Sequence, residues 1–166
     1  MDYLWTPWRY KYVAGLDQKK EEACVFCNAV AANDDARTLI VLRGKKNFVI
    51  LNQFPYTTGH CLVVPYEHQG DFAALDVETL AEMMQMAQRL VRAFGVTYSP
   101  QGYNLGMNLG RCAGAGVADH LHLHVLPRWP GDASFMTTIA EARLHPEELA
   151  QTYEKLSKAL ANETAS

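Results

Sequence analysis

The chain has 166 residues, of which 49% are hydrophobic and 20% charged, and its formal net charge is -3 at pH 7. This composition predicts an ordinary globular protein of one domain, long enough to bury its own core. No cluster of lysine and arginine forms a basic stripe, so nucleic acid is not an expected partner. No apolar run could cross a bilayer and no signal-like segment opens the chain, which argues against a membrane protein and predicts a cytoplasmic location.

The first twenty residues are rich in aromatic side chains that follow neither a helical nor a strand period. We expect residues 1–20 to form an arm, because aromatic side chains at this density must be buried against the same subunit or a partner subunit. The aromatic residues of this arm are Tyr3, Trp5, Trp8, Tyr10 and Tyr12.

A pair of cysteines, Cys24 and Cys27, follows the arm. In a cytosolic chain this spacing predicts a metal site or a redox pair rather than a structural disulfide. A turn would bring both thiolates onto one ion, and zinc would need two more ligands, which histidines can supply. Two other interpretations remain: two buried apolar cysteines, or a thioredoxin-like pair, which the lack of a βαβ pattern disfavours. Cys61 and Cys112 are expected to be ordinary residues.

The pattern becomes β-like after residue 37. Residues 39–43 and 47–52 are short β-rich runs, and the three residues between them, Gly44 to Lys46, have the length of a hairpin turn. A third strand is expected from about residue 60 to residue 64. Asn52 ends the second strand, where a side chain that caps the following turn is one interpretation.

Two helices are expected from apolar residues at three- and four-residue spacing. The first is bounded by Asp76 as N-cap and Gly95 as stop, and the second opens at Pro146 and frays from residue 162. The apolar stripe of the first comprises Leu80, Met83, Met84, Ala87, Leu90, Val91 and Phe94. The stripe of the second comprises Leu149, Tyr153, Leu156 and Leu160. Short strands followed by a helix and more strands predict an α+β fold with a mainly antiparallel sheet.

Between these helices, residues 103–109 are expected to form a strand with Asn104, Gly106 and Asn108 on one face, leaving room for a ligand. The glycine-rich loop that follows, residues 110–116, suits a close approach of backbone N–H groups to an anion. Alone, such a loop is weak evidence, but its position just before a group of histidines favours a phosphate site.

Half of the six histidines lie in residues 120–124 at strict alternation. In a strand, His120, His122 and His124 would therefore share one face while the leucines between them face the core. Pro127 is expected to end the strand and to leave Arg128 at its rim. The three rings could bind a metal, or one could be a nucleophile that its neighbours orient. The third interpretation is a plain exposed polar face.

Residues 120–128, together with 108–110 and 113–114, resemble the signature of the histidine triad (HIT) superfamily of nucleotidyl hydrolases and transferases. Further segments resemble its bacterial diadenosine tetraphosphate phosphorylase branch. They are residues 4–7, 51–52, 55–56, 59–60, 104–106, 127–129 and 131–132. The resemblance implies the HIT-like fold, with one long central helix and a C-terminal helix in a single domain over residues 1–166. It also implies a homodimer in which the arm lies near the active site.

The resemblance assigns His122 as the nucleophile that attacks an α-phosphorus, with His120 and His124 flanking it, and no metal is needed for this chemistry. It favours a ribose contact for Asn52. One departure concerns the glycine loop, where many relatives carry Ser, Thr or Gln but this chain has Gly116 and Val117, so backbone groups would have to bind phosphate. The expected nucleotide-binding residues are Asn52, Asn108, Gly114, Gly116, His124 and Arg128.

Some members of this family with a matching cysteine pair bind zinc through two histidines, which correspond here to His68 and His120. The resemblance therefore implies a structural zinc ion bound by Cys24, Cys27, His68 and His120.

The implied substrates are adenine nucleotides or dinucleoside polyphosphates. Phosphorolysis of diadenosine tetraphosphate would give ADP and ATP, whereas hydrolysis at the same bond would give AMP and ATP. The alternatives are a HIT hydrolase of nucleotide phosphoramidates or dinucleoside polyphosphates that uses water, a nucleotide-binding regulator without catalysis, and a zinc scaffold.

Overall fold

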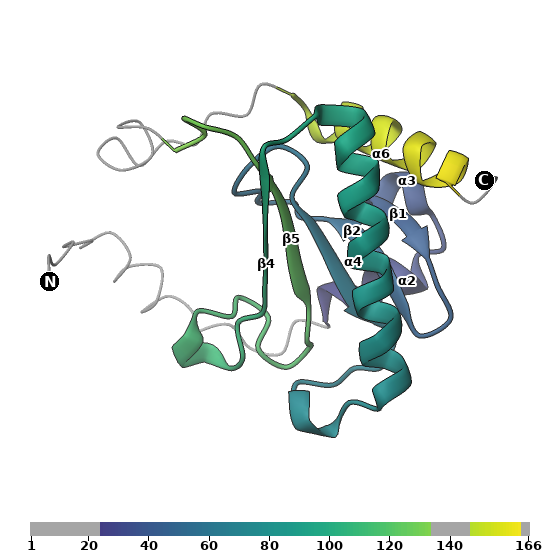
Figure 1. Cartoon of the computed structure of the whole chain (residues 1–166). Helices are drawn as coiled ribbons and strands as arrows, with labels where there is room; N and C mark the ends of the chain where they lie inside the picture. The colour runs from purple at the N-terminus through teal and green to yellow at the C-terminus, as the bar shows by residue number, and fades with distance from the viewer. Residues whose placement is uncertain (1–23, 134–146, 164–166) are drawn as a thin grey trace, which may run out of the picture.

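A five-stranded antiparallel sheet is the centre of the structure, a computed structural model that describes residues 24–133 and 147–163. The strand order is β1-β2-β3-β5-β4, so the last two strands in sequence have exchanged places (Figure 1). The aromatic arm predicted over residues 1–20 lies outside the described residues. The strands are β1 (Ile40–Arg43), β2 (Asn47–Leu51), β3 (Cys61–Pro65), β4 (Gly102–Gly106) and β5 (Leu123–Arg128). The predicted α+β class is confirmed.

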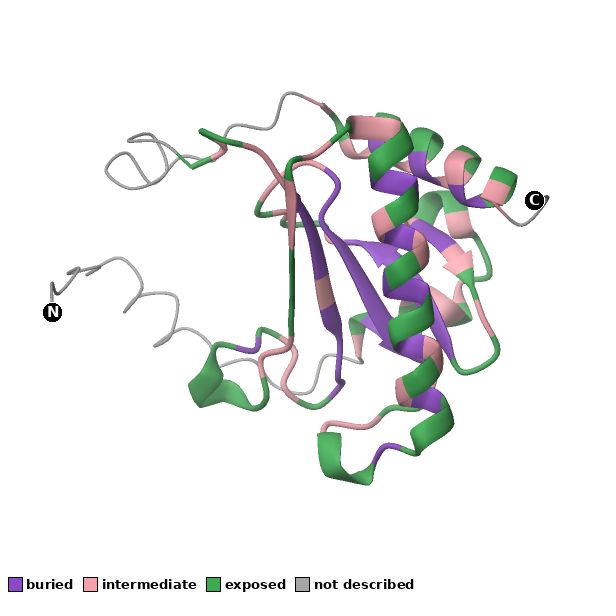
Figure 2. Cartoon of the chain, in the orientation of Figure 1, coloured by how far each residue is buried: buried purple, intermediate pink, exposed green. Residues whose placement is uncertain are grey.

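Helices cover the two faces of the sheet unequally. The long helix α4 (Val77–Tyr98) and the C-terminal helix α6 (Leu149–Glu163) pack on one face, where the larger apolar core includes Leu90, Phe94 and Leu156. The short helix α2 (Val25–Ala31) lies on the other face, over a smaller cluster around Phe26 and Phe48 (Figures 1 and 2). The remaining short elements are α3 (Asp35–Thr38) and the 3-10 turns Phe72–Ala74 and Arg111–Ala113. None of the described helices is both long enough and apolar enough to cross a membrane.

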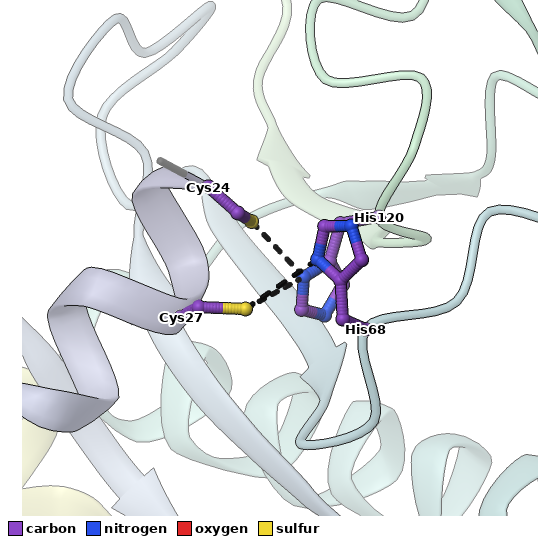
Figure 3. A group of neighbouring side chains, drawn as sticks. All are labelled: Cys24, Cys27, His68 and His120. Atoms are coloured by element: carbon purple, nitrogen blue, oxygen red, sulfur yellow. Dashed lines mark hydrogen bonds between the residues drawn. The ribbon is translucent and has the colours of Figure 1, made fainter. Parts of the chain in front are cut away.

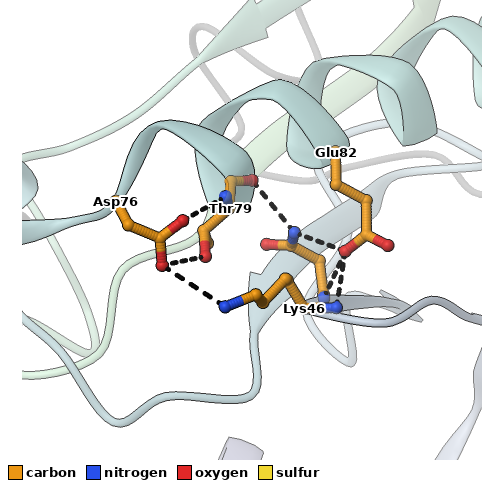
Figure 4. Close-up of polar contacts among 5 residues, drawn as sticks. Lys46, Asp76, Thr79 and Glu82 are labelled. Carbon is orange, nitrogen blue, oxygen red and sulfur yellow. Dashed lines mark hydrogen bonds and ion pairs between the residues drawn. The ribbon is translucent and has the colours of Figure 1, made fainter.

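The predicted hairpin between β1 and β2 is confirmed, and a carboxylate from α4 holds it. Glu82 accepts hydrogen bonds from the backbone N–H groups of Lys45, Lys46 and Asn47 at 2.7 to 2.8 Å. Figure 4 shows Glu82 with Lys46, Asp76 and Thr79. The side-chain amide of Asn47 also donates to Glu82 and to the carbonyl of Thr79. These contacts fix the turn against the first half of α4, and Asp76 caps that helix as predicted by accepting from the Thr79 N–H at 2.7 Å.

The long helix does not stop at Gly95. It continues to Tyr98 and ends at Ser99, which adopts a left-handed conformation with φ 45°. Tertiary contacts explain the extra turn, because Tyr98 packs against the core and its hydroxyl donates to Glu147 at 2.6 Å. The predicted apolar stripe is also shifted, since Met84 is 52% exposed while Met86 and Ala93 are buried.

The C-terminal helix begins at Leu149, later than its predicted start at Pro146, because Glu147 and Glu148 are not helical and the Glu148 carbonyl accepts the first bond of the helix, from the Thr152 N–H. Fraying from residue 162 is wrong, because the helix runs to Glu163. Glu163 forms ion pairs with Arg89 and Arg92 of α4, which hold the last turn against that helix.

The strand that carries the histidines differs from its prediction at both ends. β5 begins only at Leu123, because the N–H of Leu121 donates to Gln69 in a loop instead of to a neighbouring strand. It also includes Pro127, contrary to expectation. The Pro127 carbonyl accepts a hydrogen bond from Thr57 Oγ1, on the side of β5 that faces away from β4. The backbone N and O of one residue in an antiparallel strand point to the same side, so the missing N–H of Pro127 also faces away from β4. No hydrogen bond of the β4–β5 ladder is lost.

The predicted strand over residues 103–109 is shorter in the structure and forms an edge of the sheet. β4 ends at Gly106, and among the described residues it pairs only with β5. Its central and last residues are exposed, in contrast to the buried strands beside it (Figure 2). The face of β5 and β4 that carries the histidines is therefore accessible beyond the area that α2 covers.

Candidate active site

The ring of His122 has one nitrogen fixed by the backbone and one left for chemistry. Its Nδ1 lies 3.0 Å from the carbonyl oxygen of His120, which can only accept a hydrogen bond. Nδ1 therefore carries the proton of the neutral ring, and Nε2 keeps its lone pair. The side chain is 7% exposed, and burial lowers the pKa of His122 below its ordinary value. The ring is thus neutral near pH 7, with the lone pair of Nε2 available for chemistry.

A second pair of rings fixes the opposite tautomer at His124. The backbone N–H of Tyr56 donates to Nδ1 of His60, so His60 carries its proton on Nε2, which lies 2.8 Å from Nδ1 of His124. His124 is then the acceptor on Nδ1 and bears its own proton on Nε2. That Nε2 is buried and has no hydrogen-bond partner in the described structure. Burial, with a smaller contribution from the charge on His122, lowers the pKa of His124 to about 4.

Sequence reasoning did not identify His60 as a site residue. It is 1% exposed and immediately precedes β3. The pairing of Leu62 with His124 places even-numbered residues of both strands on one face, so His60 joins the histidine face. A buried histidine next to a strand that pairs with the triad strand is the signal that could have identified it, but this pairing was not predicted.

The loop between β2 and β3 covers one side of this pair of rings. The ring of Tyr56 stacks on His124, with centroids 5.8 Å apart and an interplanar angle of 18°, and lies 4.7 Å from His60. Asn52 accepts from the N–H of Phe54 at 2.9 Å, which is the turn-capping interaction considered for it. Its amide nitrogen also lies 3.2 Å from Nδ1 of His60, so Asn52 belongs to the same group of side chains.

The glycine-rich loop precedes the histidines in the chain, and part of its backbone is already hydrogen-bonded within the loop. The N–H of Gly114 donates to the carbonyl of Arg111 at 2.9 Å, and Gly114 has a φ of 90° that favours glycine. For Gly116 no such backbone bond is found in the described part of the chain. Asn108 follows β4 by two residues, beyond the end of the strand at which Gly106 pairs with His124.

Arg128 is at the other end of β5 and already has a partner. It forms a bidentate ion pair with Asp132, with contacts of 2.6 and 2.7 Å, and donates to Asn104. This pairing raises the pKa of Arg128 and holds the pKa of Asp132 below its usual value. Arg128 is therefore not grouped with the three histidines, and a phosphate at Arg128 would have to share the guanidinium with Asp132.

The two cysteines and two histidines predicted to bind a metal lie together (Figure 3). Cys24 Sγ is 3.1 Å from Nδ1 of His120, Cys27 Sγ is 3.4 Å from Nδ1 of His68, and all four ligand atoms lie within 4.8 Å of one another. The prediction that the two cysteines lie in a turn is wrong. Cys24 is the N-cap of α2, and Cys27 lies in the first turn of that helix. Residues three apart in a helix share a face, so both thiols still converge.

This donor set fits zinc. Ligand bonds of 2.0 to 2.3 Å in a tetrahedron place ligand atoms about 3.3 to 3.8 Å apart, close to the distances seen here. His120 donates from Nε2 to the carbonyl of Pro65 at 2.9 Å, which leaves the lone pair of Nδ1 toward the thiols. Burial, together with the neighbouring Cys24, raises the pKa of the Cys27 thiol, as expected of two thiols that no cation compensates.

The sheet, the alternating histidines and the glycine loop define a histidine triad protein. The chain belongs to the HIT domain family, whose model matches residues 33–131, and is an enzyme of its nucleotidyltransferase or hydrolase type. The AP-4-A phosphorylase of Mycobacterium tuberculosis is 38% identical over 154 residues, which cover 90% of this chain and 79% of the relative. The adenosine 5'-monophosphoramidase of Schizosaccharomyces pombe is 27% identical, covering 81% of this chain and 96% of the relative.

Solved structures agree with this assignment. A zinc-bound histidine triad family protein from Mycobacterium smegmatis superposes with a TM-score of 0.71 and 34% identity, covering 87% of this chain and 98% of that protein. A histidine triad nucleotide-binding protein from Sulfolobus tokodaii gives a TM-score of 0.68 and 27% identity, covering 84% and 93% of the two chains. The predicted family and fold are thereby confirmed.

Proposed function

We propose that this enzyme transfers the nucleotidyl group of a dinucleoside polyphosphate, such as diadenosine tetraphosphate, through a covalent adduct on His122. The observation that carries the proposal is the pair of opposite tautomers. His122 offers a lone pair on Nε2, while His124 offers a proton on Nε2, and their ring centroids are 4.9 Å apart. One group can attack, and the other can donate a hydrogen bond to the oxygen that gains negative charge as the leaving group departs.

The first step forms one bond and breaks one. The lone pair of His122 Nε2 attacks the α-phosphorus, the bond from that phosphorus to the bridging oxygen breaks, and the leaving nucleotide departs as a phosphate anion whose developing charge the N–H at His124 Nε2 stabilises by a hydrogen bond. In the second step phosphate, or water that gives its proton to solvent, attacks the adduct, the bond from phosphorus to His122 Nε2 breaks, and His122 returns to its neutral form. Backbone N–H groups of the glycine loop support the phosphate oxygens during both steps.

We assign the remaining nucleotide contacts by position. Asn52 lies next to His60 and is proposed to contact a ribose while it keeps its hydrogen bond with the Phe54 N–H. Asn108 and Gly116, between β4 and the triad, are proposed to bind the nucleotide. Gly114 is proposed to bind the nucleotide once its N–H gives up its bond to the Arg111 carbonyl. Arg128 is proposed to contact the distal part of a long substrate, with part of the charge of Arg128 neutralised by Asp132. His120 is assigned to hold His122 through its carbonyl oxygen rather than to react.

Phosphate is proposed as the acceptor, because the M. tuberculosis relative is named as a phosphorylase. The runner-up is hydrolysis of dinucleoside polyphosphates or phosphoramidates, which the name of the S. pombe relative favours. Chromatography of the products from diadenosine tetraphosphate separates them. ADP and ATP in the presence of phosphate support phosphorolysis, whereas AMP as the only new product at saturating phosphate contradicts it. A silent nucleotide-binding regulator or a zinc scaffold would give no products.

We further propose that Cys24, Cys27, His68 and His120 bind one structural zinc ion. When bound, the ion would close a four-ligand site and fasten α2 to the start of the triad segment, without taking part in the reaction. Thiolate ligands persist in a reducing compartment, which is consistent with a cytoplasmic location.

The proposed quaternary structure is a homodimer of single HIT domains. The edge of β4 supports it, since an unpaired strand edge can accept a second copy. Apolar side chains exposed near this edge and on the outer face of α4 add to that support. They are Leu105, Val77 and Met84.

A further inference from the structure

Phe26 is one of the two residues between Cys24 and Cys27, and its ring contacts the triad instead of solvent. Its side chain is 6% exposed. The ring centroid lies 5.3 Å from that of His120, at an interplanar angle of 78°, and 5.3 Å from that of His122, at 50°. The proposed reaction has no role for Phe26, although its ring touches the proposed nucleophile.

The position of Phe26 depends on how α2 is attached. The helix has only seven residues and its N-cap, Cys24, makes no side-chain capping bond. A helix this short is not stable by itself, so tertiary contacts must hold it. Those contacts are the apolar cluster under Phe26 and the group of metal-ligand side chains on either side of it. The cluster around Phe26 comprises Ile40, Phe48, Ile50, Leu62 and Val64.

The ring of His122 needs more than its single hydrogen bond to stay in place. The bond from Nδ1 to the His120 carbonyl fixes one nitrogen, but a rotation of the ring about its χ2 angle would break this bond and turn Nε2 away from the substrate side. Phe26 occupies the space on one side of the ring, while His124 lies on another at an interplanar angle of 67°. Packing at this density leaves no room for that rotation.

We propose that Phe26 is a positioning residue for the reaction: its ring, held by α2 between the two metal-binding cysteines, keeps the imidazole of His122 in the one orientation that presents Nε2 to phosphorus. This inference rests on the proposed role of His122 as nucleophile. The N-terminal end of α2 then affects catalysis, because a displacement of this end moves Phe26 and allows the ring of His122 to rotate.

A loss of positioning should change the chemical step more than binding. The single-turnover rate of nucleotidyl-enzyme formation should fall at least about tenfold in Phe26→Ala, with KM within about threefold of the wild type. Phe26→Leu, which refills most of the space, should recover most of the rate. Val30→Ala is the matched control, since Val30 lies in the same helix and packs against the same apolar cluster. It should lower the unfolding midpoint but leave the rate nearly unchanged.

The zinc content of every variant shows whether α2 is still attached to the sheet. If Phe26→Ala loses the ion, the proposal is judged on the single-turnover rate of Phe26→Leu, provided that this variant keeps its ion. Equal rate losses in Phe26→Ala and Val30→Ala, or a raised KM with an unchanged rate, would overturn the proposal.

A second readout needs no turnover. In a long-range proton–nitrogen spectrum of the substrate-free protein, His122 should show one set of signals with its proton on Nδ1 in the wild type and in Val30→Ala. Phe26→Ala should show two sets or an average of the two tautomers. Identical His122 signals in Phe26→Ala and the wild type would contradict the inference. A wild-type protein that forms no adduct contradicts the proposed function instead. In that case the spectra still test whether Phe26 fixes the orientation of the His122 ring.

Discussion

His60 and His124 share a hydrogen bond of 2.8 Å between Nε2 of the first and Nδ1 of the second. Because the Tyr56 N–H already occupies Nδ1 of His60, the direction of this bond is fixed and the proton of His124 must be on Nε2. A backbone group in a loop thereby determines which nitrogen of a triad histidine is a hydrogen-bond donor. The consequence is a chain of three residues that leaves the N–H of His124 Nε2 free to stabilise the charge on a leaving oxygen.

Breaking this chain should slow the step in which the leaving group departs. We expect His60→Ala to reduce the single-turnover rate by about 10- to 100-fold, somewhat below the effect of losing one donor to a developing negative charge. The loss should shrink to a few-fold with an AMP ester of a nitrophenol, whose ring delocalises the charge of the leaving oxygen. Rate measurements on both substrates check this.

The matched variant for that experiment is His60→Gln. Its side-chain amide can still donate to Nδ1 of His124, so it should recover part of the lost rate. Equal losses on both substrates would show that His60 serves the fold rather than the stabilisation of the leaving group.

The stability of the protein should depend on pH through His124. Its pKa is about 4 in the folded chain against an ordinary value of 6.5, so the unfolded state binds more protons between these two values. The stability due to neutral His124 is therefore complete above pH 6.5 and is lost as the pH falls toward 4. Urea unfolding at several pH values should show a smaller decrease in His124→Asn than in the wild type. Parallel curves would contradict the assignment.

Removal of the proposed zinc ligands should cost stability. One zinc ion per chain is expected in the wild type and none in the double variant Cys24→Ser, Cys27→Ser. A loss of about 2 kcal/mol would lower Tm by roughly 4 to 8 °C in a chain of this size. Elemental analysis and thermal unfolding are the measurements. Cys112→Ser is the control, because Cys112 is an exposed cysteine outside the cluster and should change neither result.

The hairpin contact of Glu82 should contribute strongly to folding. Although burial alone would raise its pKa, the hydrogen bonds from Asn47, Lys45 and Lys46 hold the pKa of Glu82 below its usual value. Glu82→Gln replaces one acceptor oxygen with a donor that faces these N–H groups, and should destabilise the protein by about 1 to 3 kcal/mol. Glu154→Gln on the exposed side of α6 should stay within about 0.5 kcal/mol. Similar urea midpoints for both variants would refute the role of Glu82.

Local chemistry made several features predictable from the sequence. Asp76 caps α4 because its carboxylate accepts the Thr79 N–H, a contact that needs only neighbouring residues. The alternation of His120, His122 and His124 likewise follows from extended backbone, and it is confirmed although the first two precede β5. The convergence of Cys24 and Cys27 was also predictable, since both a turn and a helical first turn bring them together.

Features that depend on distant contacts were not predictable in this way. Gly95 is a local stop signal, but the contacts of Tyr98 with the core and Glu147 carry α4 past it. The place of β5 between β3 and β4 joins residues about sixty positions apart, and only this pairing brings His60 to His124. The engagement of Arg128 by Asp132 could not be foreseen from an arginine that simply follows a strand.

The central claim is that His122 becomes covalently nucleotidylated, and mass spectrometry of the protein tests it most directly. The enzyme is mixed with diadenosine tetraphosphate, quenched within its first turnover in alkaline denaturant and digested. We predict one added adenylyl group on His122 in the wild type and none in His122→Asn, which should still bind nucleotide. Products that appear without any adduct, or an adduct that persists in His122→Asn, would contradict the account.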